Sequence, residues 1–229
     1  MGASISLAGV YKEFGPLKVL EDWNVVIAPA ERIAVLGLSG SGKTTFLRLL
    51  AGIEAPTRGE LKVSSQDVGF VFQEPRLIPW RTVRQNLLFV NEQADIEQLL
   101  SHLHLQGFAD YYPTQLSGGM RQRVNLARAL AVSPELLIMD EAFASLDLKV
   151  KVDIMNDVLG LWRKHRFTMV TVTHDLKEAL YLADRILMIS SRPSRIVHEF
   201  PVSLPEKRSF ASPELMRLEG ELLKLVCQQ

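Results

Sequence analysis

The stretch IAVLGLSGSGKTTFLRLL, residues 33–50, joins a short apolar run to a glycine-rich turn and then to an amphipathic segment. Residues 33–36 are continuously apolar, which favours a strand buried on both faces. Residues 43–50 have helical character and are followed by Gly52, a residue type that often ends a helix. The stretch therefore predicts a buried strand, a tight turn and a helix, in that order.

The turn reads Gly37-Leu38-Ser39-Gly40-Ser41-Gly42-Lys43-Thr44 and matches the pattern G-x-x-x-x-G-K-[S/T] in full. Glycines let successive backbone N–H groups surround an anion, and the N-terminus of the following helix adds positive potential. In such a loop the lysine reaches the outer phosphates of a nucleotide, and the hydroxyl of Thr44 ligates Mg²⁺. A glycine-rich turn with an incidental lysine is the alternative, and it leaves the flanking strand and helix unexplained.

The rest of the chain alternates between strand and helix patterns. Half-buried strands are expected within residues 4–28, and residues 75–131 are expected to form a helical insert. Further strands are expected at residues 61–63, 68–72, 136–140, 168–173 and 186–189, and helices at 83–90, 96–103, 148–164, 175–182 and 213–226. Strands that alternate with helices predict an α/β fold with a mostly parallel sheet.

Composition narrows the classes of partner. Basic and acidic residues number 26 each, so the net charge favours neither nucleic acid nor an anionic membrane surface. Cys227 is the single cysteine and cannot form an internal disulfide, which fits a reducing, cytosolic setting. No apolar run approaches the roughly 18 residues of a spanning helix. Contact with a membrane is therefore expected to occur through another protein.

Two carboxylates follow the buried strand expected at residues 136–140. Asp140 and Glu141 come at its C-terminal end, where ligand sites of open α/β sheets gather. Asp140 suits a Mg²⁺ shell, and Glu141 suits a general base that orients or deprotonates water. Acidic residues at a strand end are often only solvated. The pair therefore indicates a catalytic site only in combination with the phosphate loop.

A second glycine-rich segment, Ser117-Gly118-Gly119, directly precedes a strongly helical stretch. Glycine within a helix costs about 1 kcal/mol relative to alanine, so its presence requires a reason. One explanation is a helix cap at Ser117 followed by a turn. The other is a second phosphate-binding surface, where glycine backbone and a helix N-terminus approach a phosphate closely.

These motifs together resemble the ATP-binding subunits of ABC transporters, over nearly the whole chain. Leu116-Ser117-Gly118-Gly119-Met120-Arg121-Gln122 is similar to the signature sequence of that family. Gln73 stands at the position of the Q-loop glutamine, Leu146-Asp147 resembles the D-loop, His174 resembles the switch histidine, and Phe14 matches the adenine-stacking aromatic. The resemblance implies a P-loop NTPase with a RecA-like sheet, an antiparallel β subdomain and a helical insert, as a single ATP-binding domain over residues 1–229.

The resemblance also implies a site shared by two copies of the chain packed head to tail. Each ATP would lie between the phosphate loop of one copy and the Ser117 segment of the other. Glu141, His174, Lys43 and Gln73 would take part in catalysis, and Thr44, Gln73 and Asp140 would hold Mg²⁺. Nucleotide contacts are expected at Phe14, Gly37, Leu38, Ser39, Gly40, Ser41, Gly42, Lys43, Thr44, Thr45, Ser117, Gly118, Gly119, Gln122 and Asp147.

Several of these positions have a plainer explanation. His174 could cap the helix that follows it, Gln73 could be a polar residue at a strand end, and Tyr11 competes with Phe14 for the adenine. The sequence also departs from the family pattern, since Ala142 replaces the usual proline after the glutamate and Ala30-Glu31 replaces Gly-Glu. No departure removes a catalytic group, but Ala142 is expected to leave the turn after Glu141 less rigid.

The segment Leu77-Ile78-Pro79-Trp80 resembles the importer branch that takes up nitrate, sulfonates, taurine and similar oxyanions, or pyrimidine precursors. The resemblance implies permease subunits in the membrane as partners, an extracytoplasmic solute-binding protein as an indirect one, and a place at the cytoplasmic face of the inner membrane. The alternative for Trp80 is local packing within the insert. A soluble ABC ATPase, an exporter half and a metabolic kinase remain alternative classes, although a kinase would lack Leu-Ser-Gly-Gly.

Overall fold

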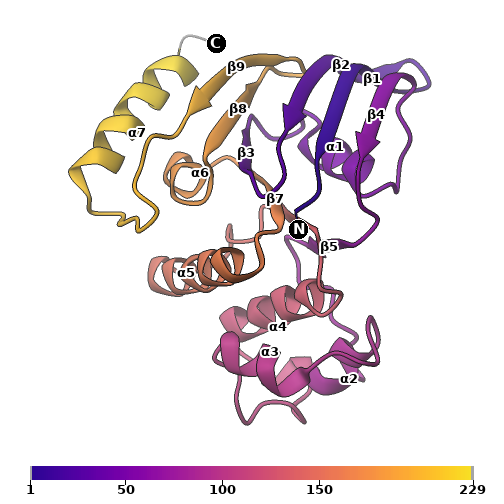
Figure 1. Ribbon diagram of the computed structural model, residues 1–229, viewed down its shortest axis with the longest axis vertical. Helices are drawn as coiled ribbons and strands as arrows, with labels where there is room; N and C mark the ends of the chain where they lie inside the picture. The colour runs from indigo at the N-terminus through magenta and orange to yellow at the C-terminus, as the bar shows by residue number, and fades with distance from the viewer. Residues whose placement is uncertain (1, 228–229) are drawn as a thin grey trace. The chain divides into compact units, whose positions relative to one another are not determined.

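In the computed structural model, the apolar run at residues 33–36 forms the strand β3 (Arg32–Leu36; Figure 1). This strand is buried along its whole length. The structure describes residues 2–227, and the chain divides into two compact units. One unit holds residues 65–167, and the other holds residues 2–64 and the chain from residue 168 onward. The single domain expected over residues 1–229 stays a prediction, and residues 1, 228 and 229 lie outside the described part.

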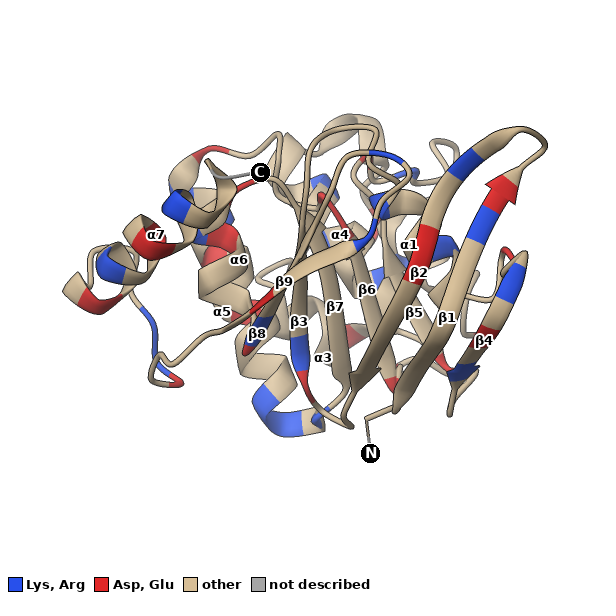
Figure 2. Cartoon of the chain, turned by 90° about the horizontal axis from the view of Figure 1, so that it is seen from above, with Lys and Arg blue, Asp and Glu red and all other residues tan. Residues whose placement is uncertain are grey.

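Residues 4–28 form the antiparallel strands β1 (Ile5–Phe14) and β2 (Leu17–Ile27), which pair with β4 (Arg58–Val63) in the order β2-β1-β4. Their alternating apolar side chains face inward, and Trp23 packs on Phe46 of α1 (Lys43–Leu50) with 4.7 Å between ring centroids. Basic and acidic residues both occur along these three strands (Figure 2). The expected antiparallel β subdomain is therefore present.

The same unit contains a second sheet, in which β3 lies between the parallel strands β7 (Thr168–Thr173) and β8 (Arg185–Ile189). A further strand, β9 (Ile196–Pro201), pairs antiparallel with β8. Helix α6 (Leu176–Leu182) follows β7 and contacts β3 and helix α7 (Pro213–Val226). Strands β7, β3 and β8 confirm the parallel α/β character that the alternation predicted.

The unit of residues 65–167 combines two parallel strands with helices. β5 (Val68–Val71) pairs with β6 (Leu136–Asp140). Its helices are α2 (Val83–Leu88), α3 (Ile96–His102), the 3₁₀ turn η1 (Pro113–Gln115), α4 (Gly118–Leu130) and α5 (Leu148–His165). Gly69 of β5 lets α4 approach closely, since a Cβ there would lie 2.3 Å from the Ala129 carbonyl oxygen. Four of these elements (α2, α3, η1 and α4) lie within residues 75–131, as the expected helical insert requires.

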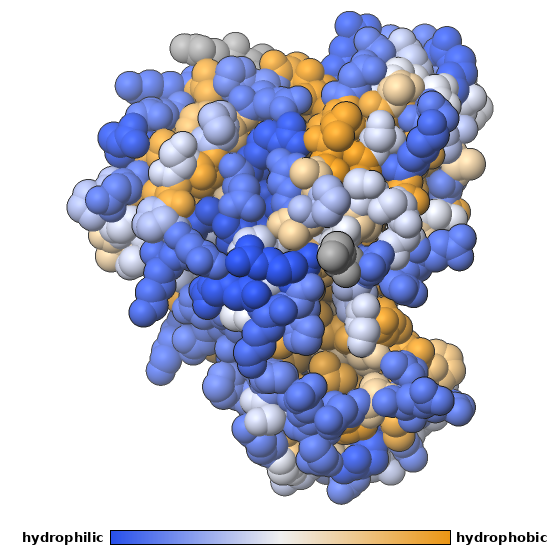
Figure 3. All heavy atoms as spheres, in the orientation of Figure 1, coloured by the Kyte–Doolittle hydropathy of each residue, from blue (hydrophilic) through white to orange (hydrophobic). Residues whose placement is uncertain are grey.

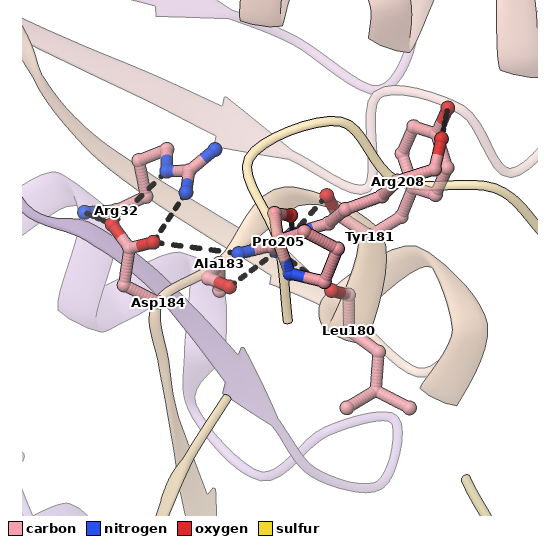
Figure 4. A network of polar contacts seen from close by, with 7 residues as sticks. All are labelled: Arg32, Leu180, Tyr181, Ala183, Asp184, Pro205 and Arg208. Carbon is pink, nitrogen blue, oxygen red and sulfur yellow. Dashed lines mark hydrogen bonds and ion pairs between the residues drawn. The ribbon is translucent and has the colours of Figure 1, made fainter. Parts of the chain in front are cut away.

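A buried arginine closes the C-terminal end of α6 (Figure 4). Arg208 donates hydrogen bonds to the carbonyl oxygens of Leu180 (2.7 Å), Tyr181 (3.1 Å) and Ala183 (2.6 Å), which a helix end leaves unpaired. It also contacts Asp184, which in turn binds Arg32 at the start of β3. Burial, with a smaller effect from Arg32, lowers the pKa of Arg208 to about 10. This network ties α6, β3 and the chain leading to α7 together.

The expected boundaries differ from the observed ones at a few element ends. β5 ends at Val71, one residue earlier than expected, and α2 ends at Leu88 instead of residue 90. β9 and η1 were not expected at all. β9 is an edge strand in which Phe200 alone is buried, so its sequence shows little apolar alternation. None of the helices within residues 2–227 has the length and apolar composition that crossing a bilayer demands.

Candidate functional site

The phosphate loop leaves β3 at Leu36 and enters α1 at Lys43. Gly40 and Gly42 have positive φ angles of 79° and 104°, which glycine adopts without strain. A Cβ at Gly42 would also lie 2.8 Å from Cγ1 of Val19, and one at Gly37 would lie 2.5 Å from Cγ1 of Ile189. Backbone conformation and lack of space therefore explain the glycines of this loop.

Polar groups of the loop are arranged as an anion site requires. The Nζ of Lys43 donates to the carbonyl oxygens of Gly37 (2.8 Å) and Leu38 (3.0 Å), so the ammonium group lies over the loop. Within the described part of the chain, the Ser41 hydroxyl is buried and finds no hydrogen-bond partner. Thr44 and Thr45 lie in the first turn of α1, whose N–H groups point toward the loop. An anion held here would gain several donors at once.

His174 lies beside the start of this loop. The parallel register pairs Leu36 with Thr173, so Gly37 and His174 leave their strands side by side. Gly37, Leu38 and His174 line one cavity of about 400 Å³. His174 is not the cap of α6, because Asp175 accepts the hydrogen bonds from the N–H groups of Lys177 and Glu178. The plainer explanation of His174 as a helix cap is therefore wrong.

The two aromatic candidates for adenine stacking differ in how open their rings are. Phe14 ends β1 in a hairpin with Leu17 and is 42% exposed, with Lys12 4.6 Å from its ring centroid. The Tyr11 ring is half-buried under the guanidinium group of Arg58, at 4.2 Å. Phe14 is thus the ring with more free surface for a base.

Asp140, the expected metal ligand, ends β6 in the unit of residues 65–167, and Glu141, the expected base, directly follows it. Glu141 has a φ of +44°, in the left-handed region that few non-glycine residues adopt. The carbonyl oxygen of the next residue, Ala142, accepts a 2.6 Å hydrogen bond from Nε2 of Gln122. The turn after Glu141 therefore has a side-chain support, and the lower rigidity expected from Ala142 in place of proline stays a prediction.

Gln122 differs from its expected role as a nucleotide contact. Its side chain is directed into the unit, the residue is only 4% exposed, and the amide bonds to protein carbonyls. Its expected contact with the nucleotide rested only on its position in the signature motif, next to the Ser117 segment. Helix geometry explains the difference, because Gln122 lies four residues after Gly118 and faces the core side of α4.

The glycines of the Ser117 segment have separate structural settings. Ser117 caps α4, since its Oγ accepts from the N–H of Met120 at 3.3 Å, as the plainer explanation proposed. Gly119 allows α4 and α5 to meet, because a Cβ there would lie 2.7 Å from Cγ1 of Val150. Gly118, in contrast, is exposed and has open space around a potential Cβ, with the nearest atom 4.0 Å away. Neither the cap nor packing accounts for Gly118.

The two remaining candidates lie at the surface of this unit. Gln73 is exposed, two residues past the end of β5. Asp147 caps α5, where its Oδ1 accepts from the N–H of Val150 at 3.1 Å. The structure thus gathers the loop and His174 in one unit, with Asp140, Glu141, Gln73, Ser117 and Asp147 in the other.

Comparison with known proteins identifies the group to which such motifs belong. The family model described as ABC transporter matches residues 20–144, from β2 to just past Glu141. An aliphatic sulfonates import ATP-binding protein of Pseudomonas syringae pv. tomato is 43% identical, with 93% of each chain covered. The chain belongs to the ABC transporter ATP-binding family. It is an ABC importer subunit that hydrolyses ATP, and the hydrolysis is coupled to import.

Solved ABC cassettes resemble this chain closely in fold. A dimeric ABC transporter cassette has a TM-score of 0.76 and 30% identity, covering 88% of this chain and 100% of that chain. A post-hydrolysis state of an ATP-binding cassette, bound to ADP and phosphate, has a TM-score of 0.74 and 29% identity over the same shares. These similarities confirm the expected P-loop NTPase fold and the binding of ATP.

Proposed function

We propose that this ABC ATPase drives the import of an aliphatic sulfonate, or of a closely similar small oxyanion, through permease subunits in the membrane. The feature that supports ATPase activity is the phosphate loop, with its glycines, its lysine and the buried hydroxyl of Ser41, which has no hydrogen-bond partner among residues 2–227. The cargo is supported by the similarity to the aliphatic sulfonates import ATP-binding protein of Pseudomonas syringae pv. tomato.

The loop and the helix N-terminus of α1 would hold the triphosphate, with Phe14 against the adenine. Lys43 would place its positive charge against the outer phosphates, where negative charge spreads during phosphoryl transfer. Glu141 would accept the proton of the water that attacks the γ-phosphorus, while the bond to the β–γ bridging oxygen breaks and ADP leaves. His174 would hold a γ-phosphate oxygen from the other side of the loop. Positioning and electrostatics of this kind supply most of the rate in such reactions.

Mg²⁺ fits the donors that this chain offers. The hydroxyl of Thr44, the carboxylate of Asp140 and the side-chain oxygen of Gln73 are hard oxygen ligands of the type that Mg²⁺ prefers. The bound cation would neutralise charge on the β- and γ-phosphates. Thr44 and Asp140 would therefore fix the orientation of the phosphates as well as hold the metal.

Two copies are needed to complete the site in this proposal. Gly118 opens the first turn of α4 and is exposed, without a packing function, so the N-terminus of this helix is accessible to a phosphate. Ser117 would add its hydroxyl and Asp147 would contact the neighbouring copy from the start of α5. The phosphate loop of one copy would thus face the Ser117 segment of the other.

A surface formed by α2 and the residues that flank it suits the permease. Trp80 is 77% exposed and Phe89 61% exposed, and both line one hollow together with Leu88. Figure 3 shows hydrophobic side chains at the surface in the lower half of the view, where the helices of this unit lie. Large exposed aromatic and apolar residues of this kind mark sites of protein contact. Trp80 is not packed within the insert, so the plainer explanation of this residue is wrong.

The loop that carries Trp80 is rigidly held from within. Asn86 is fully buried, and its Oδ1 accepts from the N–H of Ile78 at 2.8 Å. Its Nδ2 donates to the carbonyl oxygens of Arg81 (3.1 Å) and Thr82 (3.0 Å). The backbone that carries Trp80 is therefore held in place before any partner arrives, which lowers the entropic cost of ordering the loop on binding. Through this contact the chain would sit at the cytoplasmic face of the membrane, with a solute-binding protein on the other side.

Transport assays test the cargo. Cells that lack the chromosomal copy of this chain, but keep its permease and solute-binding protein, are expected to regain ethanesulfonate uptake when the chain is supplied. Uptake of labelled ethanesulfonate and of labelled nitrate is measured with the parent and with the Lys43→Ala variant. Restored nitrate uptake without ethanesulfonate uptake would replace the proposed cargo, and no uptake of either would reject both.

Trp80→Ala tests the permease surface. The purified variant is expected to keep the ATPase rate of the isolated chain, because Trp80 lies outside the phosphate-binding elements. Ethanesulfonate uptake is expected to fall by about tenfold or more, as loss of a central interface aromatic costs at least ~2 kcal/mol. Tyr112→Ala removes another exposed aromatic side chain (44% exposed) elsewhere in the unit and serves as the control. Unchanged uptake with Trp80→Ala would place the permease elsewhere.

A further inference from the structure

We propose that Gln122 is a positioning residue for Glu141, oriented by a hydrogen-bond relay that runs along α4 from Arg128 through Asn125. The inference rests on the proposed role of Glu141 as the base and adds the residues that hold it in place. All the contacts lie within the unit of residues 65–167.

The end of the relay holds the turn next to the base. The Nε2 of Gln122 donates to the carbonyl oxygen of Ala142 at 2.6 Å, inside the protein. Ala142 itself is buried, and Glu141, directly after β6, has a left-handed φ of +44°. A left-handed backbone at a non-glycine residue persists only where its surroundings hold it. The hydrogen bond to the adjoining carbonyl is such a restraint.

The middle of the relay sets which way the Gln122 amide points. The Nδ2 of Asn125 donates to Oε1 of Gln122 at 3.3 Å and to the carbonyl oxygen of Phe72 at 2.8 Å. With its oxygen occupied by this donor, Gln122 directs its NH₂ group toward Ala142. Asn125 is itself fully buried, so a reversed amide would leave polar groups without partners.

Arg128, at the start of the relay, fixes the donor-to-acceptor direction of all the hydrogen bonds in it. Arg128 donates from Nη2 to Oδ1 of Asn125 at 3.2 Å, and arginine has no acceptor atom. The oxygen of Asn125 must therefore face Arg128, and its NH₂ group must face Gln122. Residues 122, 125 and 128 are spaced by three, which places them along one side of α4.

Arg128 also anchors the segment that follows Gln73. Its guanidinium group donates to the carbonyl oxygens of Pro75 (2.8 Å) and Arg76 (2.8 Å). Burial lowers the pKa of Arg128, as expected for a guanidinium group that is held away from water. The approach to the Trp80 loop and the turn beside Glu141 thus share one chain of hydrogen bonds. Sequence motifs do not reveal this connection, because the partners are main-chain carbonyls.

A double-mutant cycle on the full chain tests the relay. Gln122→Met keeps the length of the side chain and removes its donor, and Arg128→Met removes the source of the orientation. We expect kcat to fall about tenfold for Gln122→Met and about threefold for Arg128→Met, with the Kd for ATP within about twofold of the parent. The double variant is expected to match Gln122→Met, because Arg128 acts on the reaction through Gln122. Gln98→Met, at an exposed position of α3, is the matched control.

Thermal stability separates positioning from a general structural effect. Arg128→Met loses its bonds to Pro75 and Arg76 in either background, so its Tm losses are expected to add to those of Gln122→Met while the kcat losses do not. A kcat for Gln122→Met within about twofold of the parent, or kcat losses that multiply, would overturn the proposal. The ATPase rate of Glu141→Gln is measured in the same series. A parental rate for Glu141→Gln would reject Glu141 as the base. An inactive Glu141→Gln together with a parental rate for Gln122→Met would reject only the relay.

Discussion

Glu141→Gln is expected to bind ATP as tightly as the parent chain and to hydrolyse it at least about 100-fold more slowly, because an amide cannot accept the proton of the attacking water. The substitution keeps the size and the hydrogen-bonding shape of the side chain. Lys43 and the glycines of the phosphate loop, which hold the nucleotide in our proposal, are unchanged. The result would be a nucleotide-loaded pair of chains that closes and does not turn over.

Phosphate release under saturating ATP gives the rate, and a binding titration gives the Kd for ATP. Size-exclusion chromatography with ATP present checks that the variant accumulates as a dimer. Glu97→Gln, an exposed glutamate paired with Arg84, is the control and should hydrolyse ATP at the parental rate. Parental hydrolysis by Glu141→Gln would assign the base to another residue.

Gly118→Glu is expected to abolish hydrolysis while leaving the fold as stable as before, or slightly more stable. A side chain at this position meets open space, and glutamate is favoured over glycine in the first turn of a helix by about 0.5–1 kcal/mol. The same carboxylate would repel the γ-phosphate bound by the opposing copy. Loss of activity together with an unchanged or raised Tm would be hard to explain by misfolding.

Mixing two inactive variants tests whether the site is shared. Lys43→Ala keeps an intact Ser117 segment, and Gly118→Glu keeps an intact phosphate loop. A mixed dimer therefore contains one complete site, and random pairing should restore about a quarter of the parental activity. ATPase activity is measured for each variant alone and for the equimolar mixture. If the mixture stays as inactive as its components, the site does not lie between two copies.

The local pattern was sufficient for most elements. The helices Lys43–Leu50 and Pro213–Val226 were predicted with the bounds that the structure shows, and the buried run before Gly37 was predicted to within one residue of β3 (Arg32–Leu36). Their apolar periodicity, glycines and caps act between residues that are close along the chain. These signals can therefore be recognised in the sequence without the tertiary structure. β9 escaped prediction because an edge strand buries few side chains, and its partner β8 is set by the tertiary fold.

The sequence alone determined that this protein binds and hydrolyses ATP, because the motifs that predict this activity, above all the phosphate loop, are contiguous in the chain. It did not determine what holds these groups. Only the tertiary structure showed that Gly119 serves helix packing, that Asp175 rather than His174 caps α6, and that Gln122 supports the turn at Ala142. Each of these depends on a partner that is distant along the chain or on the direction in which a side chain points. Neither can be predicted from the residues that are neighbours in the sequence.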